Sequence, residues 1–454
     1  MKYTIIGAIF SFTLAHQVSS AKELEKPFFS FRGWETQIDG LWCEPRGGSS
    51  FWYKNDFYLN YLDEVLKRAP YYDANALILM GRGNHGEVPT VISYRNWPRL
   101  HEIYKDRGRA DRELQIKKLN ELVTKAKPHG MEVYIWTHEL HLPPELATEY
   151  PSTAGIRAPF CPSEPDLWRF VSGKYEEFFD RVPGLAGMFL VLSETQFNLL
   201  PGSPCQCERC QAAPPEQFLE SVIRAVAQPL AQRGKRLVVR TFGESADQCR
   251  QICTAVNRLP ADLEFTVMSK STTQDFVGLR YPDHPAFKLI KARPQFLEDV
   301  FGEFRGKTNV IVTPADFYRA RIQRAATAGV QGVVLRLDHN GYPKSNFETA
   351  NEFNIYFTSR LWTNPDSDPD EVWNEWVQRR YGSTSTIFHY PGSQRLHSES
   401  RLHGSERLEL AWVPRAAHAH IENKRSYRDY VWQAALRTVD EVANTRRGLP
   451  QTTG

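Results

Sequence analysis

The feature that most constrains the fold of this chain is a regular alternation between short apolar runs and amphipathic stretches with helical spacing. Residues 112–127 illustrate the helical type, with Leu114, Leu119 and Leu122 recurring among charged side chains. The apolar runs occupy residues 28–34, 75–80, 132–137, 187–192, 236–242, 264–269, 295–300 and 332–337. Strands that alternate with helices form parallel sheets, and this series predicts an α/β fold closed into a (β/α)8 TIM barrel.

An open, doubly wound sheet is the alternative fold for such a pattern. That fold commonly carries a glycine-rich phosphate-binding loop after its first strand, and no such loop follows residues 28–34. Gly81-Arg-Gly83 follows the second run but is too short a signal to favour the open sheet. The closed barrel is therefore the predicted fold.

The chain of 454 residues is long enough for a barrel and an appendage. We assign residues 22–346 to the barrel and residues 347–454 to a short helical C-terminal region. Within that region, residues 347–361 and 371–381 have helical spacing, whereas residues 383–425 are polar and weakly patterned. The C-terminal region carries little functional signal.

Residues 1–21 have the pattern of a secretory signal peptide. Lys2 supplies a positive start, residues 4–15 are uncharged and apolar, and Ser19-Ser20-Ala21 offers a small-residue cleavage site. No later segment is apolar over the roughly 18 residues that a membrane span needs. We expect a secreted or periplasmic protein with no membrane span after signal cleavage; an uncleaved anchor is the alternative.

The charge balance argues against a nucleic-acid partner. Lys and Arg number 56 against 53 Asp and Glu, and the net charge of +3 comes without a long basic run. The 11 Trp, 19 Tyr and 26 Phe fill a core by default, and flat rings also stack on sugar faces. The sequence does not indicate an oligomeric state.

Three of the seven cysteines crowd together in Cys205-Gln-Cys207-Glu-Arg-Cys210. In an exported protein this cluster is consistent with a disulfide to Cys161 or Cys43. The alternative is a structural zinc site completed by a fourth ligand from elsewhere. A structural role, as a disulfide or a zinc site, is a better interpretation than a catalytic thiol.

Polar side chains follow the predicted strands, at the end where TIM barrels build their active sites. Candidates that one barrel mouth would collect are Arg32, Trp34, His138, Glu194, Arg240, Lys270, Asp275, Glu303 and Asp338. Glycoside hydrolysis requires two carboxyl groups across the scissile bond, one to donate a proton and one to activate water or attack. Glu194 is the candidate acid, because an apolar run delivers it to the mouth, where a partly dry setting would favour its protonated form. Its structural alternative is a helix cap or an ion pair with Arg.

The same positions resemble the catalytic barrel of the α-glucuronidases of glycoside hydrolase family 67. The resemblance is carried by short motifs in a shared order over residues 28–382: Arg32-Gly-Trp34-Glu-Thr-Gln-Ile-Asp39-Gly40, Ser193-Glu194, Val239-Arg240-Thr-Phe242, Lys270-Ser-Thr-Thr-Gln-Asp275-Phe276 and Gly302-Glu303-Phe304-Arg-Gly306. These enzymes release (4-O-methyl)glucuronic acid from xylan fragments by inversion and without a metal. We therefore expect an oligosaccharide or polysaccharide substrate and no cofactor.

The resemblance also implies roles for individual residues. Glu194 would be the general acid, while Asp275 and Glu303 would activate the water. Lys270 and Arg240 would bind the uronate carboxylate through charge-assisted hydrogen bonds. Substrate binding would further involve Arg32, Trp34, His138 and Asp338.

The chain departs from the family in three respects. The β-sandwich that usually precedes the barrel is absent, Ser271 replaces an Asn, and the cysteine cluster replaces a glycine-rich run after the acid. Two further interpretations stay open. One is another barrel glycosidase, such as a hexosaminidase-like enzyme, although Ser193 stands where an Asp would assist Glu194. The other is a non-catalytic glycan-binding barrel.

Overall fold

A computed structural model describes residues 27–37, 52–80, 88–200, 202–273, 283–299, 315–338, 347 and 352–381. The predicted signal peptide, Cys43, Asp275, Glu303 and the chain beyond residue 381 lie outside the described residues.

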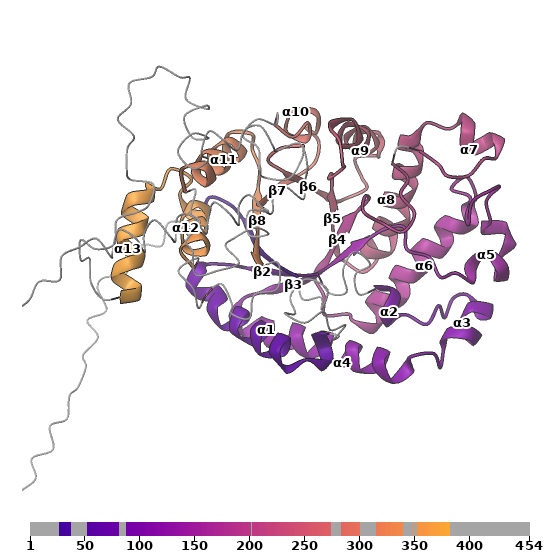
Figure 1. Ribbon diagram of the computed structural model, residues 1–454, viewed down its shortest axis with the longest axis horizontal. Coiled ribbons are helices and arrows are strands. Elements are labelled where there is room, and N and C mark those ends of the chain that lie inside the picture. Colours follow the sequence, from indigo (N-terminus) through magenta and orange to yellow (C-terminus); the bar gives the residue numbers. More distant parts are fainter. Residues whose placement is uncertain are drawn as a thin grey trace, which may run out of the picture.

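Parallel strands form a closed barrel in chain order, with β8 returning to pair with β1 (Figure 1). The strands are β1 (Phe31–Gln37), β2 (Ala76–Met80), β3 (Glu132–His138), β4 (Gly187–Val191), β5 (Arg236–Arg240), β6 (Thr266–Lys270), β7 (Gln295–Asp299) and β8 (Gly332–Asp338). Each of the predicted apolar runs overlaps one of these strands, although β1, β3, β6 and β8 extend beyond the ends of their runs. The prediction of a (β/α)8 TIM barrel is confirmed.

Helices cover the outside of the barrel. They are α1 (Asp56–Arg68), α2 (Val88–Val91), α3 (Pro98–Tyr104), α4 (Arg109–Ala126), α5 (Leu146–Glu149), α6 (Pro165–Arg181), α7 (Glu208–Ala212), α8 (Pro215–Ala231), α9 (Ala246–Arg258), α10 (Ala286–Leu289), α11 (Ala315–Thr327), α12 (Glu352–Thr363) and α13 (Pro369–Tyr381). Capping side chains explain where two of these helices begin. Ser245 caps α9 by accepting a hydrogen bond from the Gln248 amide, and Asn55 caps α1 in the same way through Phe57. None of the described helices is long and apolar enough to cross a membrane.

The barrel interior is filled by aromatic side chains. Strand residues alternate between two faces, and those that face inward bury Phe31, Tyr134, Trp136, Phe189 and Phe296 in one cluster. Phe31 stacks on Phe296 with ring centroids 4.3 Å apart, and Tyr134 meets Phe189 edge to face at 5.7 Å. The interior is thus a packed core.

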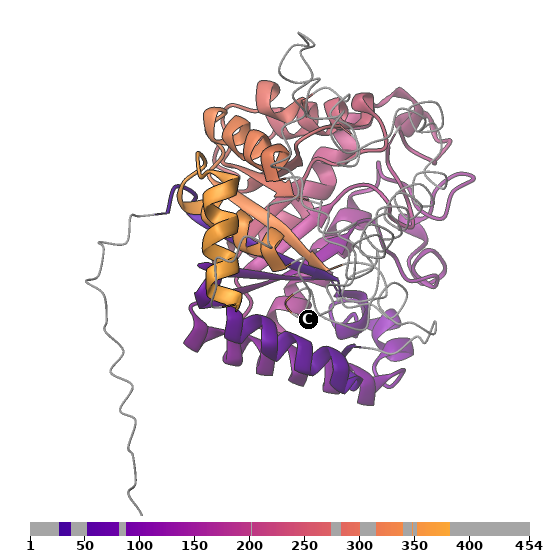
Figure 2. The same cartoon turned by 60° about the vertical axis from the view of Figure 1, so that its left-hand side comes forward.

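The C-terminal helix α12 lies against the outside of the barrel at β8, and α13 packs against α12 and α11 (Figure 2). The backbone amide of Phe29 donates to the carbonyl of Trp362 in α12 over 3.1 Å. Trp362 is fully buried, as are Phe353 and Phe357 on the same helix. The predicted helix at residues 347–361 is therefore present as α12, although it begins later, and it packs as part of the barrel's outer layer.

Candidate active site

A layer of buried charged side chains lies above the aromatic core, near the carboxyl ends of the strands. Its members are Glu35, Arg240, Lys270, Glu298 and Arg336, none of which is more than 5% exposed. They face inward because each follows an interior position two residues earlier along its strand, as Arg240 follows Val238 and Glu298 follows Phe296. The carboxyl end of the barrel therefore has a charged floor.

Arg240 and Glu298 form a two-pronged ion pair in this floor. Arg240 donates from Nε to Oε2 of Glu298 over 2.6 Å, and from Nη2 to Oε1 over 2.8 Å. The guanidinium also lies over the rings of Trp136 and Phe242, 4.9 and 4.5 Å from their centroids. Burial alone would raise the pKa of Glu298, but the charges of Arg240 and Lys270 outweigh burial and lower that pKa. Glu298 is thus held as a carboxylate.

Glu35 and Arg336 form the second pair. Arg336 donates from Nε to Oε1 of Glu35 over 2.7 Å, and Nη2 contacts the same oxygen. Burial raises the pKa of Glu35, which Arg336 only partly opposes. Oε2 of Glu35 is buried and accepts no hydrogen bond from the described residues. Of the two floor carboxyls, Glu35 is therefore the one more disposed to hold a proton.

Glu194 stands at the rim above this floor. It comes shortly after β4, its backbone has a φ of 55°, and its side chain is 41% exposed. Oε2 of Glu194 lies 4.0 Å from Nη1 of Arg240. A left-handed conformation is uncommon outside glycine and is found where the surrounding structure enforces it, often at functional sites. Glu194 thus reaches the mouth as predicted, but in a more open setting than the sequence indicated.

His138 lies beneath Glu194 and supports the chain there. Trp136 donates from Nε1 to Nε2 of His138 over 2.8 Å, so the ring proton resides on Nδ1. That Nδ1 lies 2.9 Å from the carbonyl oxygen of Ser193, to which it donates. His138 is only 2% exposed. Both its ring nitrogens contact other parts of the protein, and its assignment to substrate binding stays a prediction.

Lys270 occupies the floor beside Arg240, and Phe242 lies between them. The Lys270 ammonium is 4.0 Å from the centroid of the Phe242 ring, which Arg240 also contacts. The structure thus brings together three predicted site residues, Glu194, Arg240 and Lys270. Glu35, Glu298 and Phe242 join them, and these three were not selected from the sequence. The two-residue alternation of buried strands is the signal that could have found the two carboxylates.

Two predicted substrate-binding residues lie elsewhere. Arg32 is at the amino-terminal end of β1, where Nε donates to the carbonyl oxygen of Asp73 over 2.6 Å and Nη2 pairs with its carboxylate. Trp34 is fully buried and faces outward, against the rings of Tyr72 and Phe347. The structure does not bring these two side chains to the other predicted site residues, since Phe31 faces the barrel interior and the even-numbered positions beside it face outward. Their assignment to substrate binding stays a prediction. Asp338 ends β8, but its side chain is outside the described part of the chain.

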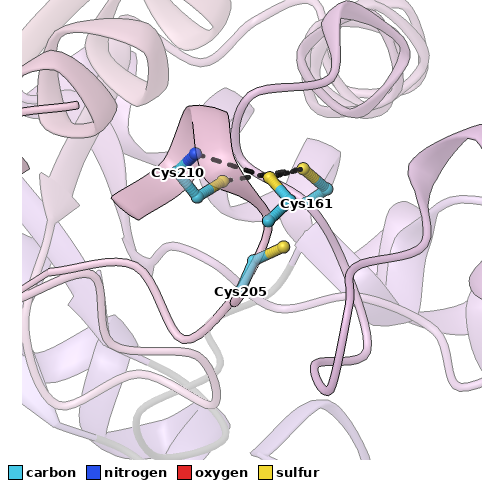
Figure 3. Close-up of side chains that lie close together, drawn as sticks. Cys161, Cys205 and Cys210 are labelled. Atoms are coloured by element: carbon cyan, nitrogen blue, oxygen red, sulfur yellow. Dashed lines mark hydrogen bonds between the residues drawn. The ribbon is translucent and has the colours of Figure 1, made fainter. Parts of the chain in front are cut away.

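The cysteine cluster forms beyond the strands. Cys205, Cys207 and Cys210 meet Cys161, from the segment before α6, with all four sulfur atoms within 4.8 Å of one another. Figure 3 shows Cys161, Cys205 and Cys210 close together. All four are free thiols in the described structure.

Neither a protein-family model nor a curated protein matches the sequence. Solved structures do match. A GH138 enzyme targeting pectin rhamnogalacturonan II has a TM-score of 0.54 at 13% identity, over 78% of this chain and 41% of its own. A variant of the O-GlcNAc hydrolase of Thermobaculum terrenum has a TM-score of 0.48 at 13% identity, over 78% of this chain and 64% of its own. The β-N-acetylhexosaminidase of Bacteroides fragilis has a TM-score of 0.46 at 12% identity, over 78% of this chain and 70% of its own.

At 13% identity, the similarity to the GH138 enzyme shows the fold alone. The chain spans less than half the length of the GH138 enzyme. All three structures are of glycoside hydrolases by name, and none is an α-glucuronidase of family 67. The family 67 resemblance remains a prediction.

Proposed function

We propose that the protein is a glycoside hydrolase in which Glu194 is the proton donor. The observation that carries the proposal is the position of Glu194, an exposed carboxyl group directly above a buried charged floor at the carboxyl end of the barrel. Active sites of TIM barrels are built at this end, from residues that follow the strands. A group that must meet the glycosidic oxygen has to be exposed, as Glu194 is.

The surroundings of Glu194 suit a proton transfer. Donation leaves a carboxylate, and Arg240 is close enough, at 4.0 Å, to stabilise that negative charge. Arg240 itself is oriented by Glu298, and the Ser193 carbonyl before Glu194 is held by His138. The family 67 resemblance assigns the activation of water to Asp275 and Glu303. An inverting reaction then requires about 6.5–9.5 Å between acid and base.

A uronic-acid-bearing glycan, such as a xylan fragment carrying (4-O-methyl)glucuronic acid, is the first substrate candidate. Lys270 and Arg240 share the floor below Glu194, and cations recognise a sugar carboxylate by charge-assisted hydrogen bonds. The GH138 enzyme, whose barrel is similar, targets pectin rhamnogalacturonan II.

A neutral N-acetylhexosaminide is the second candidate. The observation in its favour is that Nε and Nη2 of Arg240 already donate to Glu298, so these two donors are not available to a sugar carboxylate. Ser193 in place of an assisting Asp counts against it. The two candidates differ in one testable property, the charge of the sugar.

Hydrolysis assays with the purified full-length protein test the proposal. The substrates are aldouronic acids, aryl uronides and aryl N-acetylhexosaminides, each with good and poor leaving groups. Glu194→Gln is expected to lower turnover by roughly 10²-fold or more on poor leaving groups and less on activated ones. Glu244→Gln, which changes another exposed carboxyl group that follows a strand, is the matched control and is expected to leave turnover nearly unchanged.

Equal losses on both kinds of leaving group would contradict the acid role. Proton NMR of the first product from an α-uronide is expected to show the β-anomer, and an initial α-anomer would exclude inversion. Binding of these sugars without hydrolysis of any would instead make the protein a glycan-binding barrel.

A further inference from the structure

Four cysteines from two separate loops converge outside the barrel mouth. Cys161 lies between β3 and α6, Cys205 and Cys207 lie between β4 and α7, and Cys210 is within α7. All four sulfur atoms are within 4.8 Å of one another. Sγ of Cys161 is 3.7 Å from that of Cys207 and 3.6 Å from that of Cys210 (Figure 3).

These separations have the dimensions of a metal-thiolate tetrahedron. A disulfide needs about 2.05 Å between two sulfur atoms and brings them together in pairs. Zinc binds thiolates at about 2.3 Å, which places tetrahedral sulfur ligands roughly 3.8 Å apart. Cys161 is nearly equidistant from two other sulfur atoms, which is the arrangement of a shared central ion. We propose that Cys161, Cys205, Cys207 and Cys210 bind a structural Zn²⁺ ion.

Hydrogen-bond donors around the cluster are suited to thiolate ligands. The amide of Ile156 donates to Sγ of Cys205 over 3.3 Å, and the amide of Cys210 donates to Sγ of Cys207 over 3.4 Å. The hydroxyl of Ser163 lies 3.0 Å from Sγ of Cys210. Donors of this kind orient the ligands and offset the negative charge of a four-thiolate site.

The burial of the cluster indicates a closed, structural site. Cys161, Cys205 and Cys210 are at most 3% exposed, while Cys207 is partly exposed and gives an ion a way in. Four protein ligands leave no open position for water or substrate, as in structural rather than catalytic zinc sites.

The ion would join the two loops that follow β3 and β4. The amide of Gln206 already donates to the carbonyl of Ile156 over 2.9 Å, across the same junction. Phe160, next to Cys161, meets Phe197 edge to face at 4.8 Å. Phe197 lies three residues after Glu194, so zinc would anchor the far end of the segment that carries the candidate acid.

Metal analysis of the full-length protein, purified without added metal, tests the site. We expect about one zinc per chain. When the protein is denatured in the presence of a chelator and without a reductant, we expect four more thiols to react than in the folded protein. Replacement of the zinc by cobalt is expected to give the visible absorption of tetrahedral cobalt-thiolate coordination. Absence of metal together with cluster thiols that react only after reduction would overturn the proposal in favour of disulfides. Stoichiometric iron in place of zinc would overturn the identity of the ion.

Variants locate the ligands. Cys161→Ser and Cys207→Ser are expected to lose zinc, whereas Cys253→Ala, at a buried thiol on α9 outside the cluster, is expected to retain it. If the serine variants do not fold, a strong chelator applied to the wild-type protein is expected to lower Tm, and added zinc to restore it. Zinc retained by both serine variants would contradict the assignment. These readouts are independent of glycosidase activity.

Discussion

The buried ion pair of Arg240 and Glu298 is expected to make a large contribution to the free energy of unfolding. Glu298→Gln would leave the Arg240 guanidinium buried beside a neutral partner, and breaking such a pair costs about 3–5 kcal/mol of the free energy of unfolding. Removing both charges, by Arg240→Met with Glu298→Met, is expected to cost less than the sum of Arg240→Met alone and Glu298→Met alone. Urea unfolding of these two single variants and the double variant measures this coupling. Additive losses would show that the two side chains act independently.

His284 makes a second prediction, which concerns pH. Burial lowers its pKa from 6.5 to about 4, and its ring accepts the Ala286 amide at Nδ1 and faces Thr241 at Nε2. Above pH 6.5 the ring is neutral in the folded and unfolded chains and contributes nothing. As the pH falls from 6.5 toward 4, only the unfolded chain takes up the proton, so the free energy of unfolding falls by up to about 3 kcal/mol.

His284→Gln keeps a donor near Thr241 but cannot titrate, and so isolates this contribution. Its free energy of unfolding is expected to be less sensitive to pH between 6.5 and 4 than that of the wild type, whatever its value at neutral pH. Denaturant unfolding at several pH values compares the two slopes. Parallel curves would rule out His284 as the titrating group.

At the scale of the elements, Gly187 at the start of β4 makes a prediction about strand packing. A Cβ there would overlap the carbonyl oxygen of Arg236 on β5, and backbone atoms of a paired strand cannot move aside cheaply. Gly187→Ala is expected to lower the free energy of unfolding by about 3 kcal/mol. Gly202→Ala is the control, because its nearest neighbour would be a proline carbon 3.8 Å away. Thermal unfolding of both variants checks the difference.

The strands could be predicted from the sequence because each overlaps an apolar run, and most strand residues are buried. Burial on both faces also means that the sequence does not show which side chains of β1 face the barrel axis. Phe31 and Trp34 are both large and apolar, so hydrophobicity alone does not show which of them faces the barrel axis. The resemblance to family 67 led to Arg32 and Trp34, whereas the alternation of the strand points Glu35 inward instead.

The site at the mouth was predictable only in part for a related reason. Glu194, Arg240 and Lys270 follow or end strands, where a barrel requires its site, and they do come together. The partners of a buried cation depend on distances between strands far apart in the sequence. Arg240 and Glu298 are 58 residues apart, and no local pattern pairs them.

At the scale of the whole molecule, α12 belongs to the fold of the barrel despite its position after β8. Trp362 on this helix is fully buried, and its carbonyl accepts the amide of Phe29, which precedes β1. We expect a chain that ends at residue 346 to be insoluble or unfolded, while one that ends at residue 381 keeps the cooperative unfolding of the full chain. Circular dichroism during heating compares the two. A folded shorter chain would show that the barrel is independent of α12.

The aromatic core of the barrel determines the route by which a ligand can enter and leave. Because Phe31, Tyr134, Phe189 and Phe296 close the barrel from within, nothing can cross it from one end to the other. If the protein is the glycosidase proposed above, a glycan that enters at the rim beside Glu194 must leave by the same opening, and so must the sugar that is split from it. The first product must therefore leave before the next glycan can bind, and released sugar would compete with fresh substrate for the same opening.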